Sequence, residues 1–442
     1  MRQTMDFAGK QKSEIAEDLE AYLRHRVMPY WYDTAIDAAN GGYKLADEHY
    51  TAGIFRRKWL LLVRSNYSQR NSLRTKEKQL VSQCRMLFVF SLVHRLGYSG
   101  NERNYLKAAE HGYRFLIESM LDEKYGGFYW RTDLQGRVLD QGKSLYGQAF
   151  TIYALVEYHR ASGLADPLDR ALALYRKVQE KFYDGINSGW IEHGEQDFTP
   201  LNALSSRSLW TERGMPGMIG FKSGNANLHW MEALIELYCL TSDAFVKTSL
   251  MSSLNINKTF FYPSDPSGSC DYRMAEWSEV GDSNYEGMSY GHTVEFAWLM
   301  IYAQKVLQIA PDWNHFDNIL MHALKYGFDH KKGGFYWKGF NEHTASDTTK
   351  VWWVQAEGLA ALVEAVQHNT NAYYERALSL LLSWIFKYQI FSDDGIWIAS
   401  TTGEGKPLDI TKAGSWKAAY HEIRAITKFI DMFSPSGSNH VS

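Results

Sequence analysis

The sequence predicts an all-α protein, an (α/α)6 barrel in which six helical hairpins close into a ring, with short β-hairpins and long loops on one face. Apolar residues recur at spacings of three and four along most of the 442-residue chain, which is the period of helices. A glycine followed by aromatic residues recurs between these segments. No section is rich enough in strand pattern to build a parallel sheet, which argues against Rossmann and TIM-barrel folds.

The apolar periodicity divides the chain into twelve helical segments, or six pairs. We expect helices near residues 11–29, 76–97, 103–121, 143–161, 165–183, 225–242, 244–262, 291–308, 312–328, 350–367, 370–388 and 414–432. Repeated helical pairs are typical of architectures that stack hairpins. Residues 1–442 are therefore expected to form a single barrel domain, with a loose tail at 434–442.

The recurring glycines predict tight turns that lead into short strands. The repeated units are Gly41-Gly42-Tyr43, Gly126-Gly127-Phe128-Tyr129-Trp130, Gly189-Trp190, Gly333-Gly334-Phe335-Tyr336-Trp337 and Gly395-Ile396-Trp397. The interval from Gly127 to Gly189 is 62 residues, and the interval from Gly334 to Gly395 is 61. Gly268 is a weaker candidate that divides the long interval between Gly189 and Gly334.

Three intervals lack helical periodicity, at residues 43–75, 192–224 and 263–290. Insertions of this kind collect on one face of a ring and shape the mouth of its central pocket, so this face is expected to carry the chemistry. The segment 56–74 is locally basic, and we interpret it as a solvated loop in preference to an anion-binding patch.

The overall composition limits the class of function. The chain is 45% apolar with a net charge of -3, which excludes disorder and gives no electrostatic reason to expect nucleic acid or an anionic membrane as a partner. Its 15 Trp and 28 Tyr are numerous, and such rings stack on the C–H faces of sugars. A large core would also absorb many aromatic residues, so both interpretations stay open.

The cysteines and the first residues of the chain indicate the cellular compartment of the protein. Cys84, Cys239 and Cys270 are far apart and odd in number, which suggests neither a disulfide framework nor a zinc knuckle. The start of the chain has no apolar signal-like region, and runs such as Trp59–Val63 are too short to span a bilayer. We therefore expect a cytoplasmic protein.

Three histidines are candidates for proton transfer. His292 follows a turn and begins the predicted helix Tyr290-Gly291-His292-Thr293-Val294-Glu295, and His229 and His421 take similar places in other helices. A lone histidine at such a point is usually a cap or a core residue, but three of them favour a shared site. An imidazole can be both base and conjugate acid near neutral pH.

Two of these histidines have an acid three residues later. Glu232 follows His229 and Glu295 follows His292, so each carboxylate can reach its own histidine or a ligand hydroxyl beside it. The chain has no H-E-x-x-H pattern, and no metal is predicted.

Other side chains are candidates for ligand binding. Arg85 lies among apolar residues and must place its charge on a ligand oxygen or in a structural salt bridge. Trp352 and Trp353 are adjacent, and since neighbours point to different sides of a helix, at most one is expected to face a pocket while the other packs. Tyr146 opens a helix and suits either role, and Trp416 could form the pocket floor.

The chain resembles the N-acylglucosamine 2-epimerase superfamily from about residue 11 to 432. Tyr290–Glu295, Lys350–Glu357 and Trp416–His421 are similar to motifs of the cellobiose and mannose 2-epimerase branch. Gly224–His229 is similar to the aldose–ketose isomerase branch, as in sulfoquinovose and mannose isomerases.

This resemblance implies an (α/α)6 barrel in which His292 and His421 act on opposite faces of an open-chain sugar, while His229 assists ring opening. It implies that Arg85 polarises the carbonyl oxygen and that Glu232 and Glu295 orient or hydrogen-bond. No redox cofactor is needed, and none is predicted. The candidate substrate-binding residues are Arg85, Tyr146, Asn225, Glu232, Glu295, Trp352, Trp353, Glu357 and Trp416.

The chain departs from the pattern in three places. Ala419 replaces the usual proline of the disaccharide epimerases, the 43–75 segment is longer than usual, and the loop around Cys270-Asp271-Tyr272-Arg273 is divergent. These loops are expected to border the mouth, so they bear on substrate size. We find no features of the nucleotide-binding enzymes, so an N-acetylated substrate and an ATP effector are not expected.

We predict a sugar 2-epimerase that acts on an unphosphorylated mannose- or glucose-type aldose, free or at the reducing end of a disaccharide, as a monomer or homodimer. The alternative is an aldose–ketose isomerase. A further alternative is an (α/α)6 glycoside hydrolase, which would use two carboxylates, for example from Asp271, Asp282 and Asp347. A non-catalytic carbohydrate-binding protein would require that His292 and His421 do not share a pocket.

Overall fold

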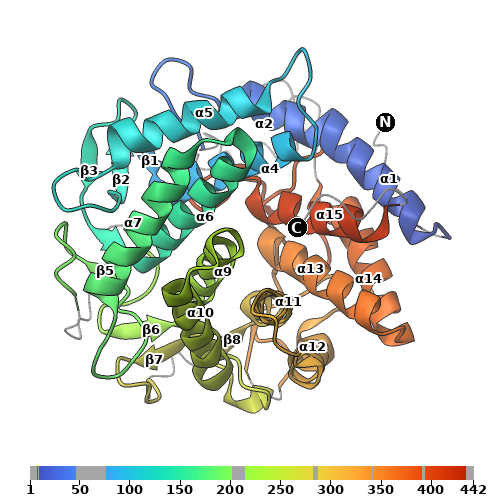
Figure 1. The fold of residues 1–442 in the computed structure, drawn as a ribbon. Coiled ribbons are helices and arrows are strands. Elements are labelled where there is room, and N and C mark those ends of the chain that lie inside the picture. Colours follow the sequence, from blue (N-terminus) through green and yellow to red (C-terminus); the bar gives the residue numbers. More distant parts are fainter. Residues whose placement is uncertain are drawn as a thin grey trace.

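The computed structural model describes residues 7, 9–45, 76–201, 215–281, 287–340, 343–390 and 394–434. Six helices form an inner ring (Figure 1). They are α4 (Leu80–Arg95), α6 (Leu145–Ser162), α9 (Gly224–Thr241), α11 (Tyr290–Val306), α13 (Trp352–His368) and α15 (Tyr420–Phe433). Each contacts the next, and α15 contacts α4, so the ring closes and the predicted (α/α)6 barrel is confirmed.

A second layer of helices surrounds the ring (Figure 1). It consists of α1 (Lys12–Tyr22) with α2 (Met28–Ala35), α5 (Tyr105–Phe115), α7 (Ala165–Phe182), α10 (Ala244–Ile256), α12 (Trp313–Gly327) and α14 (Ala372–Trp384). Short π-helical turns continue α1, α5, α10 and α14 at Leu23–Val27, Leu116–Met120, Asn257–Phe261 and Ile385–Gln389. Because α1 packs on α15, the ends of the described chain form the sixth pair.

The two layers follow from the sequence pattern of their helices. In α4, residues 80–93 are all buried, as expected for a helix that is apolar on every side and lies inside the ring. In α7, burial is confined to one stripe that includes Ala171, Leu174 and Val178. An amphipathic helix of this kind must lie on the outside with its polar face in water.

Short strands lie just before the inner helices and pair with strands two helices further along the chain. The sheets are β1 (Glu77–Gln79) with β2 (Arg131–Asp133) and β3 (Val138–Asp140); β4 (Lys143–Ser144) with β5 (His193–Gly194); β6 (Phe221–Ser223) with β7 (Tyr272–Met274); β8 (Met288–Ser289) with β9 (Lys338–Gly339); and β10 (Lys350–Val351) with β11 (Ser400–Thr401) and β12 (Pro407–Asp409). All of these pairs are antiparallel. They place the loops at the N-terminal ends of the inner helices.

The predicted glycine turns are confirmed. In each, the residue after an outer helix pairs with an aromatic residue seven positions later: Ile36 with Tyr43, Leu121 with Phe128, Tyr183 with Trp190, Phe328 with Phe335, and Ile390 with Trp397. At Gly333 the backbone φ is +84° and an added Cβ would lie 2.0 Å from the Leu380 carbonyl oxygen, so only glycine fits. Gly268 does not form such a turn but ends a short 3₁₀ helix, Pro266–Gly268.

A buried lysine stabilises each of five glycine turns. Its ammonium group reaches an aspartate at the start of the turn, in the pairs Lys78–Asp37, Lys143–Asp122, Lys222–Asp184, Lys350–Asp329 and Lys412–Asp394. Four of these lysines lie two residues before an inner helix, so the pair ties one hairpin to the next. The equivalent residue before α11 is Met288.

The last predicted helix, 414–432, begins only at Tyr420. Arg85 Nη1 of α4 donates to the Trp416 carbonyl oxygen, and Gly414 N donates to the Lys417 carbonyl oxygen, so these groups are used in a loop. The basic segment 56–74 and the tail beyond 434 lie outside the described residues. Within the part of the chain that the structure describes, no helix is long and apolar enough to cross a membrane.

The lysine–aspartate pairs predict a large effect of removing one partner. In Lys143–Asp122 both side chains are fully buried and 2.9 Å apart, so Lys143→Met would leave an unpaired buried carboxylate. We expect the free energy of unfolding to fall by about 3–5 kcal/mol, measured by urea denaturation. Lys181→Met, at an exposed ion pair, should change it by less than about 1 kcal/mol, and equal effects would contradict the structural role of the buried pair.

Candidate active site

One cavity of about 710 Å³ lies at the N-terminal ends of the inner helices. The loops that the sequence leaves without helical periodicity contribute Pro216, Asp271 and Tyr272 to its wall. Most of the predicted site residues line it, namely Arg85, Tyr146, Asn225, His229, His292, Glu295, Trp352, Trp353, Trp416 and His421. The other two, Glu232 and Glu357, are buried behind histidines of the cavity wall.

Two of the cavity histidines have a carboxylate on Nδ1. His229 Nδ1 lies 2.8 Å from Glu232 Oε2 on the same helix, as the three-residue spacing allows. His421 Nδ1 lies 2.6 Å from Glu357 Oε1, which comes from α13. A carboxylate that accepts the Nδ1 proton leaves Nε2 as the nitrogen that is available to the cavity.

The third histidine has a different neighbour from the one its sequence spacing suggests. Glu295 does not pair with His292 but accepts from Arg424 Nη2 at 2.7 Å. The acid beside His292 is Asp271, whose Oδ1 lies 3.7 Å from His292 Nδ1. The reason is that Glu295 projects toward the centre of the ring, where a guanidinium is available.

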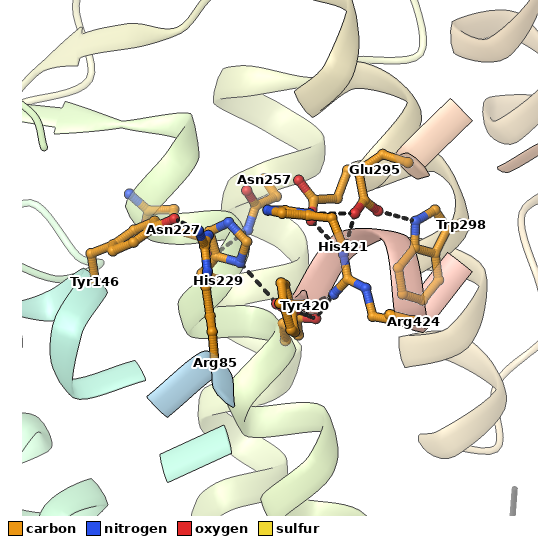
Figure 2. Close-up of polar contacts among 12 residues, drawn as sticks. Arg85, Tyr146, Asn227, His229, Asn257, Glu295, Trp298, Tyr420, His421 and Arg424 are labelled. Atoms are coloured by element: carbon orange, nitrogen blue, oxygen red, sulfur yellow. Dashed lines mark hydrogen bonds and ion pairs between the residues drawn. The ribbon is translucent and has the colours of Figure 1, made fainter. Parts of the chain in front are cut away.

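Arg424 connects the carboxylates of three inner helices (Figure 2). From α15 it donates to Glu232 of α9, Glu295 of α11 and Glu357 of α13. Tyr420, one turn earlier, also donates to Glu232 Oε1 at 2.6 Å. The flat, forked guanidinium can serve several carboxylates at once, which an ammonium group cannot do as well.

Burial sets the protonation state of the two enclosed histidines. It lowers the pKa of His229 to about 4, even though Glu232 acts in the opposite direction. Burial, together with the positive charges of Arg85 and Arg424, also holds the pKa of His421 well below its usual range. Both imidazoles are therefore neutral near pH 7, which is the form that can accept a proton.

The carboxylates around Arg424 form two groups of possible metal ligands. Donor atoms lie within 4.8 Å of one another in the set His229, Glu232 and Glu295, and in the set Glu295, Glu357 and His421. Arg424 donates to all three carboxylates, so it already supplies the positive charge that a divalent ion would bring. The expectation of metal-free chemistry stays a prediction.

Arg85 and Tyr146 form a polar corner beside His229 (Figure 2). Arg85 Nη2 donates to Tyr146 Oη at 2.9 Å, and the Tyr146 ring is 5.0 Å from that of His229. Within the described residues no carboxylate pairs with Arg85, so the structural salt bridge that the sequence leaves open is not found there. The charge of the Arg85 guanidinium is directed toward the cavity wall.

Several buried polar atoms of the cavity wall have no hydrogen-bond partner among the described residues. They are Arg85 Nε, Asn225 Oδ1, His292 Nδ1, Glu295 Oε2 and Trp352 Nε1. Buried polar atoms normally have a hydrogen-bond partner. A polyhydroxylated ligand would supply such partners.

Both tryptophans at the head of α13 line the cavity, so the expectation that only one faces it is wrong. They are the first two residues of α13, so both lie at the end of the helix that borders the cavity. The Trp353 ring lies 4.8 Å from that of His292 and 5.9 Å from that of His421. The Trp353 ring is therefore a neighbour of both histidines.

Three site residues are not identified from the sequence as parts of this arrangement. Arg424 lies one turn after His421 among Ile423, Ala425 and Ile426, and an arginine in such an apolar stripe is a signal that could have been used. Tyr420 and Asp271 have no comparable local signal. Their roles depend on partners from other helices.

Glu192 is a buried acid close to the cavity wall. It accepts from the backbone N–H of Ser223, and its Oε2 lies 2.9 Å from the Ser223 hydroxyl. Burial raises the pKa of Glu192 to about 8, and the bonds from Ser223 only partly oppose this. The group is therefore largely protonated at neutral pH.

The fold and cavity define an (α/α)6-barrel protein with a cavity lined by histidine and carboxylate side chains at the loop face of the ring. The chain belongs to the N-acylglucosamine 2-epimerase family, whose model matches residues 65–425.

Relatives with an enzyme name cover most of the chain. The cellobiose 2-epimerase of Dictyoglomus turgidum is 26% identical over 439 residues, which covers 95% of this chain and 98% of that protein. The D-mannose isomerase of Marinomonas mediterranea is 24% identical over 367 residues, covering 79% and 85%. The structure of the cellobiose 2-epimerase from Bacillus thermoamylovorans superposes with a TM-score of 0.80 at 25% identity, covering 95% and 99%.

The raised pKa of Glu192 predicts a pH-dependent stability. Between its ordinary value of 4.5 and about 8, the folded protein binds more protons than the unfolded chain, so this contribution to stability is lost as pH rises through that window. Glu192→Gln keeps the hydrogen bonds and removes the titration. We expect the variant to gain stability over wild type by up to a few kcal/mol between pH 5 and 8.5, measured by urea unfolding. Parallel pH curves would contradict the assignment.

Removal of the central guanidinium predicts a loss of stability. Arg424→Met would leave three buried carboxylates without their shared donor, and we expect the free energy of unfolding to fall by about 3–5 kcal/mol or more. Lys428→Met, one turn later at the partly exposed pair with Glu364, is the matched control and should cost much less. Similar melting temperatures for the two variants would refute the central role of Arg424.

Proposed function

We propose that this protein is a sugar 2-epimerase that interconverts C2 epimers of an unphosphorylated mannose- or glucose-type aldose, free or at the reducing end of a disaccharide. Family membership and the cellobiose 2-epimerase relatives support this class of reaction. The site observation that carries it is that His292 and His421 line one cavity and that both rings lie near the ring of Trp353.

The chemistry requires one group to remove the C2 proton and one to return it. A neutral imidazole takes the proton from C2 of the open-chain aldose, the C–H electrons form the C1=C2 bond, and the carbonyl electrons move to O1. The product is a cis-enediolate. The histidine on the other face must carry a proton in the same enzyme state. It gives this proton to C2 as the carbonyl re-forms, so C2 is left with inverted configuration and the two rings have exchanged protonation states.

The remaining residues are assigned by their positions. Arg85, with Tyr146, is suited to stabilise the negative charge that develops on O1. His229 is proposed to assist ring opening, as its neutral imidazole lies in the same wall. Asn225, Glu295, Trp352 and Trp416 are proposed to bind the sugar, whereas Glu232 and Glu357 would act through the histidines that they contact.

An aldose–ketose isomerase is the second candidate. The enediolate would then be protonated at C1 instead of C2. Asn225, in the stretch that resembles the isomerase branch, faces the cavity with an unpartnered Oδ1, and D-mannose isomerases are among the relatives. The cytoplasmic location and the monomeric or homodimeric state stay predictions.

The reaction class can be tested with mannose, glucose, fructose and cellobiose in D2O, followed by NMR. We expect an aldose epimer that carries deuterium at C2. Formation of fructose from mannose would favour the isomerase, and cleavage of cellobiose would favour the hydrolase. A lack of exchange with all four sugars would overturn the proposed function.

The histidine roles predict the behaviour of two variants. His292→Asn and His421→Asn should each lower kcat by at least about 10²-fold, since a positioned acid–base group supplies roughly 10²- to 10⁴-fold. Circular dichroism should show that the fold is retained. His25→Asn changes an exposed histidine outside the cavity and should retain full activity. Substantial turnover in either cavity variant would contradict the mechanism.

A further inference from the structure

Asp271 joins the N-terminal ends of two neighbouring inner helices. Its carbonyl oxygen accepts from Gly224 N, the first residue of α9, at 2.9 Å. Its carboxylate Oδ1 accepts from Ser289 N, just before α11, at 3.2 Å and lies 3.7 Å from His292 Nδ1. The side chain is therefore fixed by the frame of the barrel and directed at a histidine of the cavity.

The backbone position of Asp271 recurs around the ring. In each case the carbonyl oxygen accepts from the first residue of an inner helix, in the pairs Trp130–Leu80, Glu192–Leu145, Asp271–Gly224, Trp337–Tyr290 and Ala399–Trp352. Glu192 is the other acid in this set, and it accepts from Ser223 N as Asp271 accepts from Ser289 N.

Glu192 binds Ser223 and Asp271 binds Ser289, and the residue three positions after the serine differs between the two sites. Three residues after Ser223 stands Ala226, whereas three residues after Ser289 stands His292. Glu192 therefore only links the ends of two inner helices, whereas Asp271 links two helix ends and also contacts an imidazole. The pair is a matched comparison within one chain.

We propose that Asp271 is a positioning residue for His292, which holds the Nδ1 proton of the ring and leaves Nε2 free to exchange a proton with the substrate. The inference rests on the proposed function. The same arrangement is present at shorter distance in His229–Glu232 and His421–Glu357. The 3.7 Å separation is longer than a hydrogen bond, and such contacts are often long in empty sites and shorten when substrate binds.

Other charged groups around His292 do not replace Asp271. Glu295, one turn further along α11, is engaged by Arg424. Lys338 also lines the cavity, and its charge helps to hold the pKa of the buried Asp271 low, so the carboxylate stays ionised. Trp353 of α13 covers the His292 ring at 4.8 Å and carries no charge.

The test is Asp271→Asn, assayed by exchange of the C2 proton and by epimer formation over a range of pH. In the place of Oδ1, which both Ser289 N and His292 Nδ1 approach, the amide oxygen can still accept from Ser289 N, but it carries no charge and therefore holds the Nδ1 proton less strongly. We expect kcat to fall by about 10- to 100-fold with KM changed by less than about twofold.

Glu192→Gln is the control, because it replaces a carboxyl group by an amide at the equivalent backbone position, where the bound serine is not followed by an imidazole. It should retain the kcat and the pH profile of wild type. If Asp271→Asn behaves like this control, or raises KM alone, the positioning role is overturned while the epimerase proposal stands. If wild type exchanges no C2 proton, the proposed function fails, and with it this role in the reaction.

A measurement on wild type avoids any folding defect of the variant. In protein with ¹⁵N-labelled histidine, the His292 signals can be assigned by their absence in His292→Asn. We expect His292 in the Nδ1–H form, and the Nε2–H form would overturn the proposal.

Discussion

The arrangement of the site depends on a single buried guanidinium. Arg424, a residue of α15, binds one carboxylate from each of α9, α11 and α13. Four of the six inner helices therefore meet at one side chain. Charges taken out of water are costly unless every partner is present and well oriented. The four helices are therefore constrained to the one mutual arrangement in which this network is complete.

This network also explains how the histidines are kept ready for proton transfer. Glu232 and Glu357 each contact both Arg424 and an imidazole. The carboxylates are thus held by a permanent charge, and they in turn hold the orientation of the rings. Burial keeps His229 and His421 neutral, so both can accept a proton without first losing one.

A buried lysine–aspartate pair recurs around the ring, but the described residues show no such pair in the repeat that contributes His292 to the candidate site. Buried lysines join five of the turns to the following hairpin, but Met288 stands at that position before α11. In that repeat the turn is replaced by a loop, from which Asp271 reaches the cavity. The repeat with Met288 at the lysine position is also the one that carries His292.

Much of this could be predicted from the sequence, because local interactions decide it. The helical period reports which faces are buried, and paired glycines report backbone angles that other residues avoid, so the barrel and its turns are both confirmed. Candidates such as Arg85 and His421 could be chosen because a charged or titratable side chain in an apolar helix needs a polar partner. The helix boundary near Trp416 could not be predicted, since a side chain of α4 takes the carbonyl that the helix would use.

The sequence by itself determined the class of fold, the order of the hairpins and most of the residues around the cavity. Only the tertiary structure decided which acid serves which histidine. Glu295 is three residues from His292 but binds Arg424, whereas Asp271 approaches from a loop twenty-one positions earlier. Spacing along a helix defines which partners a carboxylate can reach. Among these partners Glu295 binds the strongest nearby charge, and that charge, Arg424, comes from another helix of the ring.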